Sequence, residues 1–98
     1  MKAYMLGSRV ADNDVWPEAF AEKIGADVIE ENRLIERLRE CNVGTEAIEQ
    51  IIFNLIAISD CIICLDRYGD KKTKHKVEYA KSLGKKVYYR HYYGRRSK

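Results

Sequence analysis

Short apolar runs along the chain predict four β-strands. Each run has four or five residues and is bounded by glycine or polar residues, as strands commonly are. The predicted strands cover Lys2–Leu6, Ala26–Ile29, Cys61–Leu65 and Lys86–Tyr89. The third run is apolar at every position, which is typical of a strand in the middle of a parallel sheet, where both faces are buried.

Between these strands the apolar residues recur at helical spacing. Trp16, Phe20 and Ile24 lie four residues apart and share one helix face, and Gly25 ends that helix. The other predicted helices cover Asn32–Cys41, a segment beginning at the N-cap residue Thr45, and Lys74–Leu83. The segment after Thr45 carries a broad apolar stripe through Ile56, so we expect this helix to be heavily buried.

The predicted order β-α-β-α-α-β-α-β indicates an α/β fold. We expect a small doubly wound, mostly parallel four-stranded sheet with helices on both faces. The 98 residues suffice for one domain, predicted over residues 1–93, followed by a basic C-terminal tail at 94–98. No apolar run is long enough to span a membrane.

The polar residues that follow two of the strands are expected to meet. Ligands of such sheets bind at the carboxyl ends of the strands, which places Gly7, Ser8 and Arg9 near Asp66–Thr73. The segment Arg67–Lys76 combines a glycine, several cations and the hydroxyl of Thr73 as a helix N-cap. Lysines and backbone N–H groups before a helix predict a phosphate site, although a flexible basic loop has the same composition.

Charge is distributed unevenly over the chain. Residues 1–60 hold 6 Lys/Arg and 12 Asp/Glu, whereas residues 61–98 hold 12 Lys/Arg and 3 Asp/Glu. A basic half predicts an anionic partner: a nucleotide phosphate, a nucleic acid or the acidic face of another copy. Aromatic and basic residues alternate over Tyr88–Arg96, a composition that can stack bases or simply pack a strand and end in a solvated tail.

The cysteines predict no redox or metal chemistry. Three cysteines and no secretory signal favour a reducing, cytoplasmic location without disulfides. Cys61 and Cys64 stand three positions apart on a strand, so their side chains point to opposite faces. With His75 and His91 on separate elements, no zinc spacing arises, and we expect neither a metal nor a cofactor.

Glu78 is the residue that we single out for catalysis. It lies in the first turns of a predicted helix, where the helix dipole favours an ionised carboxylate. A carboxylate at such an edge can attack an anomeric carbon or act as a general base. The spacing equally fits a surface glutamate that pairs with Lys74 or Lys81.

Two segments carry a resemblance to a known family. The chain opens with Met1-Lys2-x-Tyr4-x-x-Gly7, and Asp60 precedes the apolar strand, a loop and Glu78-Tyr79-Ala80-x-x-Leu83-Gly84-Lys85-Lys86-Val87. These segments resemble the nucleoside 2-deoxyribosyltransferase-like superfamily, with its small phage and bacterial relatives. The superfamily's block reads aspartate, apolar strand, loop, E-x-x-x-A-x-x-L-G-K-x-V. The resemblance covers roughly residues 1–7 and 50–90.

The resemblance implies an active site as well as a fold. A glutamate of these enzymes attacks the anomeric carbon of a nucleoside or nucleotide, and Glu78 is taken to match it. Tyr4 and Gly7 then line the sugar and base pocket. Binding of the substrate is assigned to Tyr4, Gly7, Ser8, Arg9, Asp66, Arg67, Thr73 and Lys74. Homo-oligomers are expected, because subunits of this family often complete one another's sites.

The chain departs from the family pattern at two places. Thr73 and Lys74 stand where a Ser-Gly pair is common, and Ile52 stands where a pocket aspartate is usual, with Glu49 one turn earlier as a substitute. We therefore predict a nucleoside- or nucleotide-binding protein that cleaves or exchanges an N-glycosidic bond through Glu78. The alternatives are a non-catalytic nucleotide-binding module and nucleic-acid binding through the basic C-terminal half.

Overall fold

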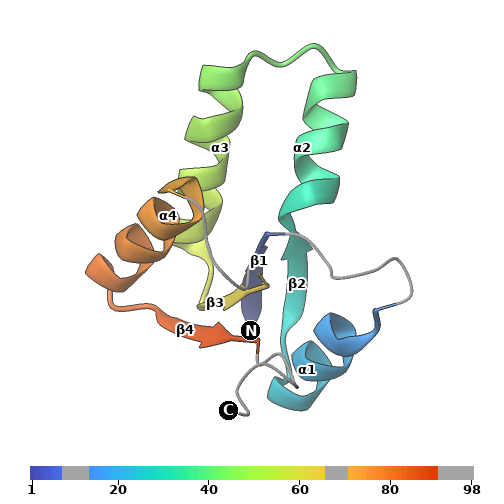
Figure 1. The fold of residues 1–98 in the computed structure, drawn as a ribbon, viewed down its shortest axis with the longest axis vertical. Coiled ribbons are helices and arrows are strands. Elements are labelled where there is room, and N and C mark those ends of the chain that lie inside the picture. The colour runs from blue at the N-terminus through green and yellow to red at the C-terminus, as the bar shows by residue number, and fades with distance from the viewer. Residues whose placement is uncertain (8–13, 66–70, 91–98) are drawn as a thin grey trace.

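The computed structural model of the chain describes residues 1–7, 14–65 and 71–90. The predicted order of strands and helices is confirmed (Figure 1). The elements are β1 (Lys2–Leu6), α1 (Trp16–Ile24), β2 (Asp27–Glu30), α2 (Glu31–Glu40), α3 (Thr45–Ile58), β3 (Cys61–Cys64), α4 (Lys71–Ser82) and β4 (Lys86–Tyr89). Four of the predicted binding residues lie outside the described residues: Ser8, Arg9, Asp66 and Arg67. The predicted tail at 94–98 also lies outside them.

The four strands form one parallel sheet in the order β2-β1-β3-β4. In the register, Tyr4 lies beside Ile29 on one side and beside Ile62 on the other, while Ile62 pairs in turn with Val87. The chain turns to one side after β1 and to the other after β3, so the switch point of the sheet lies between these two strands. The small doubly wound α/β fold is therefore confirmed, with all its strands parallel.

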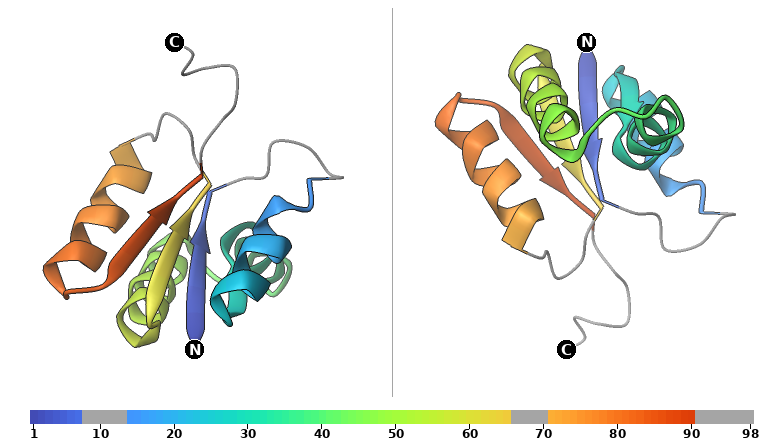
Figure 2. Two further views of the ribbon diagram at one scale, coloured as in Figure 1. Left: turned by 90° about the horizontal axis from the view of Figure 1, so that it is seen from below. Right: turned by 90° about the horizontal axis from the view of Figure 1, so that it is seen from above.

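Helices cover both faces of the sheet, as right-handed crossovers require. The two views of Figure 2 show α1 on one side and α2 and α3 on the other, with α4 beside β4. β2 runs directly into α2, and the α2–α3 hairpin extends past the ends of the strands (Figure 1). We call the side of the sheet on which the parallel strands end the carboxyl edge.

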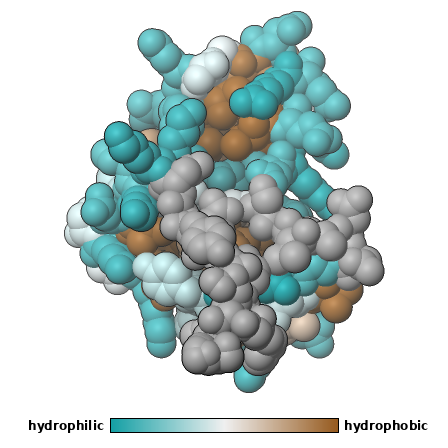
Figure 3. All heavy atoms as spheres, in the orientation of Figure 1, coloured by the Kyte–Doolittle hydropathy of each residue, from teal (hydrophilic) through white to brown (hydrophobic). Residues whose placement is uncertain are grey.

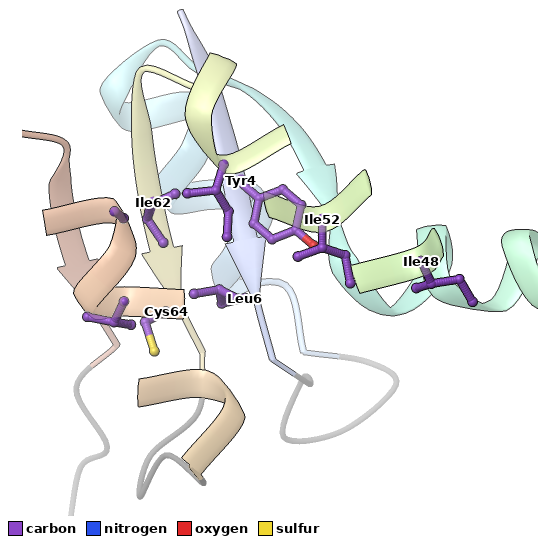
Figure 4. Close-up of a cluster of buried hydrophobic side chains, with 9 residues drawn as sticks. Tyr4, Leu6, Ile48, Ile52, Ile62 and Cys64 are labelled. Atoms are coloured by element: carbon purple, nitrogen blue, oxygen red, sulfur yellow. The ribbon is translucent and has the colours of Figure 1, made fainter. Parts of the chain in front are cut away.

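The larger core lies between the sheet and the helices α2, α3 and α4. Tyr4, Leu6, Ile62 and Cys64 of the strands pack there against buried residues of α3 and α4. Figure 4 shows the Tyr4 ring pointing from β1 toward Ile52 of α3. Ile52 is fully buried, so its side chain packs in the core. Because this side chain is apolar, it offers no polar group to a ligand.

The smaller core lies under α1. It joins Ala3, Met5, Cys61, Ile63 and Leu65 to Ala21, with Trp16, Phe20 and Ile24 packed around them. Cys61 and Cys64 thus belong to opposite faces of β3, which confirms the prediction. The three cysteines all fall within the described ranges and form no disulfide, and burial raises the pKa of the Cys61 thiol.

The N-termini of three helices differ from the sequence prediction, and α2 begins at Glu31, one residue earlier than predicted. α4 begins at Lys71, three residues earlier than predicted, so Thr73 is a buried residue inside the helix and not its N-cap. Lysine is a good helix former, and the run that follows Gly69 contains no glycine or proline to delay the helix. Gly44 is the N-cap of α3, without a side-chain hydrogen bond, and Thr45 is the first helical residue. Among the described helices, none is long and apolar enough to cross a membrane.

Candidate functional site

A buried glutamate joins three elements at the carboxyl edge. Glu31 begins α2 immediately after β2 and is only 6% exposed. Its carboxylate accepts a hydrogen bond from the Tyr4 hydroxyl at 3.1 Å and another from the Gly7 backbone N–H at 3.2 Å. The Lys76 ammonium of α4, equally buried, donates a third at 3.0 Å. The start of α2, the end of β1 and α4 are therefore fastened to one another.

The three donors explain how a carboxylate is accommodated inside the protein. An unpaired buried charge is strongly unfavourable, whereas an ammonium and two further donors satisfy both carboxylate oxygens. The N-terminus of α2 adds a favourable dipole. Burial, and then the nearby Glu31 charge, raise the pKa of Tyr4 far above its usual value, so its hydroxyl stays protonated and remains a donor.

A pocket opens beside this network, between α3 and α4. It has a volume of about 270 Å³ and is lined by Glu49, Phe53, Lys71, Lys72, His75 and Lys76. We call it the α3–α4 pocket. The Phe53 ring meets the rings of His75 and Tyr79 edge to face, with centroids 5.9 and 5.0 Å away. Lys76 lines the pocket and also bonds Glu31, so the pocket adjoins the buried network.

Positive charge dominates the α3–α4 pocket. Glu31 neutralises Lys76, but Lys71 and Lys72 are exposed and stand in the first turn of α4. The N-terminal end of a helix is itself positive, so the lysines and the helix act in the same direction. Glu49, half-buried on α3, supplies the one carboxylate among the lining residues that the structure describes. The arrangement suits an anion attached to an apolar or aromatic group.

A larger hollow, of about 550 Å³, lies on α2. Its lining consists of Asn32, Ile35, Glu36, Arg39 and Glu40, all of them residues of that single helix. It lacks the convergence of several elements that is typical of ligand sites. The α3–α4 pocket, at the carboxyl edge of a parallel sheet, is therefore the better candidate.

The structure brings together only part of the predicted site. Tyr4 and Gly7 meet through Glu31, next to the start of α4. Thr73 is buried in α4, whereas Lys74 is exposed and does not line the α3–α4 pocket. The phosphate site expected over Arg67–Lys76 is reduced, within the described residues, to Lys71, Lys72, His75 and Lys76.

Glu78 lies off the buried face of α4. The buried residues of α4 are Thr73, Lys76, Val77 and Ala80. With about 100° of rotation per residue, Glu78 lies roughly 150° from the middle of that buried face, and it is exposed. In the family block the glutamate stands four residues before the alanine. Four residues before Ala80 is Lys76, whereas Glu78 stands only two before it, and catalysis through Glu78 stays a prediction.

Sequence reasoning missed the central residue of the network. Glu31 was assigned no role, although a glutamate at a strand's carboxyl end is a recognisable signal in a parallel sheet. The sequence analysis places Lys76 only among the cations of a basic segment, and no local pattern pairs it with Glu31. Within the described ranges, no cluster of three metal-ligating side chains occurs.

No model of a protein family, no curated protein and no solved structure matches the chain.

Proposed function

We propose that the protein binds a nucleotide in the α3–α4 pocket and acts as a binding module. The observation that carries the proposal is the convergence of lysines and an aromatic ring on one cavity at the carboxyl edge. In this proposal Lys71 and Lys72 hold the phosphate at the start of α4. The base lies near the Phe53 ring, since stacking on an aromatic side chain suits any nucleobase.

Binding without cleavage is supported by the residues around the pocket. A lysine, Lys76, occupies the position that the family block gives to the nucleophilic glutamate, and it is paired with Glu31. The Glu31 carboxylate already accepts three hydrogen bonds, so its lone pairs are engaged. Cleavage of an N-glycosidic bond through Glu78 stays a prediction, as do nucleic-acid binding by the C-terminal half and a cytoplasmic location.

A thermal-shift and calorimetry panel tests the proposed function. Nucleoside monophosphates are expected to raise the melting temperature, and the free nucleosides to raise it much less, because the lysines contact only the phosphate. At a ligand concentration of 100 Kd, binding adds about 2.7 kcal/mol to the free energy of unfolding. Inorganic phosphate and the matching nucleosides are the controls.

Two results bear on the alternatives. If no nucleotide raises the melting temperature or releases heat, the proposed function is rejected. Mass spectrometry of the same mixtures tests for release of free base. Base release that Glu78→Gln abolishes would replace the binding module with the glycosidic enzyme.

We also propose that the protein forms homo-oligomers through the α2–α3 hairpin. Partly exposed apolar residues recur at helical spacing along one side of α3: Ala47, Ile51, Leu55 and Ile58. Ile58 is 62% exposed. Figure 3 shows apolar side chains at the surface in the upper part of the molecule, where the hairpin lies.

Light scattering after size-exclusion chromatography measures this self-association. Ile58→Glu is expected to shift the protein toward the monomer, because it places charge in an apolar interface. Gln50→Glu adds the same charge to another side of α3 and is expected to leave the mass unchanged. A wild-type protein that is monomeric at every concentration rejects the oligomer.

A further inference from the structure

We propose that the α3–α4 pocket selects guanine nucleotides, with Glu49 as the residue that recognises the base. The inference rests on the proposed function and adds to it the identity of the base. Its starting point is a carboxylate inside a pocket whose other charged lining residues, among those that the structure describes, are cationic. A site that held phosphate alone would gain nothing from this negative charge.

The Glu49 carboxylate is available to a ligand. Glu49 is half-buried on α3, one turn before Phe53, and both residues line the pocket. Among the residues that the structure describes, no side chain forms an ion pair or a hydrogen bond with Glu49. Its charge is also the smallest of the causes that raise the pKa of Tyr4.

The chemistry of the bases favours guanine. A carboxylate accepts hydrogen bonds through two oxygens and donates none. Guanine presents two neighbouring donors, the N1–H and the N2 amino group, whose parallel bonds fit both oxygens of one carboxylate. Adenine and cytosine each place a ring-nitrogen acceptor next to their amino group. Uracil and thymine flank a single N–H with two carbonyl oxygens, and these acceptors would face a negative charge.

The positions of the charges match the two ends of one nucleotide. Glu49 comes from α3, whereas Lys71 and Lys72 come from the first turn of α4. A ligand that bridges the two helices therefore puts its base toward α3 and its phosphate toward α4. The volume of about 270 Å³ lies just below the usual range of roughly 300–1,000 Å³ for ligand pockets, so it suits a mononucleotide better than a dinucleotide.

Calorimetry with GMP, AMP, CMP and UMP tests the selection. GMP is expected to bind the wild-type protein at least tenfold more tightly than each of the others. Glu49→Gln replaces one acceptor oxygen with a donor, so it should weaken GMP binding about tenfold and leave AMP binding within threefold. Glu46→Gln makes the same change on an exposed residue one turn earlier in α3 and should leave the GMP preference intact.

The outcomes separate the two proposals. Four monophosphates that bind with equal affinity overturn guanine selection while the nucleotide-binding function stands. A GMP preference that survives in Glu49→Gln overturns the role of Glu49. If none of the four binds, the proposed function fails and guanine selection falls with it. If the Glu49→Gln variant does not fold, the affinities of the wild-type protein for the four monophosphates still test guanine selection.

Discussion

Replacing Glu31 by alanine should lower the free energy of unfolding by about 3–5 kcal/mol, because it leaves the Lys76 ammonium buried without its partner. The same change removes the acceptor of the Tyr4 hydroxyl and of the Gly7 N–H. Small domains are stable by only about 5–15 kcal/mol, so the variant should be partly unfolded at moderate temperature. Urea denaturation monitored by circular dichroism measures the change.

Two further variants show whether the buried pair is the cause. Glu40→Ala removes an exposed carboxylate from the same helix and should cost less than about 1 kcal/mol. Adding Lys76→Met to Glu31→Ala should restore part of the loss, since an apolar side chain needs no counter-charge. A Glu31→Ala protein as stable as the Glu40→Ala protein contradicts the described network.

Replacing Lys71 and Lys72 together by alanine should weaken binding of a nucleoside monophosphate about ten- to a hundredfold. Each lysine is expected to donate a hydrogen bond to phosphate, and because both side chains are solvent-exposed each bond contributes about 0.5–1.5 kcal/mol. The pair then contributes about 1–3 kcal/mol, where about 1.4 kcal/mol corresponds to a factor of ten. Both side chains are exposed, so folding should be unaffected. Isothermal titration calorimetry gives the affinities.

The salt dependence and a control on the same helix complete this prediction. Raising the salt concentration should weaken binding to the wild-type protein more than to the double variant, because the exposed lysines are screened. Lys81→Ala removes an exposed lysine from the other end of α4 and should leave the affinity within twofold. An equal loss in Lys81→Ala would mean that overall charge, and not the pocket, determines the affinity.

The fold could be predicted from the sequence because the patterns that identify its strands and helices are local. The uniformly apolar run at Cys61–Cys64 identified the buried strand β3, and the spacing of Trp16, Phe20 and Ile24 identified the apolar face of α1. A run of four residues and a repeat of four residues can both be recognised without knowledge of the tertiary structure. The alternation of these elements then limited the possible topologies to a few.

The candidate site was harder to predict, because its parts are distant in the chain. Glu31 lies 27 residues from Tyr4 and 45 from Lys76, and no local pattern pairs them. Glu78 and Lys76 differ by only two positions, but two positions on a helix amount to about 200° of rotation, which exchanges a solvent-facing residue for a core-facing one. The sequence does not specify how α4 is oriented on the sheet. This orientation determines that Lys76 faces the core and that Glu78 faces solvent.

Titration of the isotopically labelled protein with GMP, followed by nuclear magnetic resonance, tests the central claim most directly. Binding in the α3–α4 pocket predicts the largest shifts at the backbone amides of Phe53, Lys72 and His75. The amide of Ala21, in the helix on the opposite face of the sheet, should not move. Shifts confined to α1 or to residues 91–98, or a spectrum unchanged at millimolar GMP, would contradict the account.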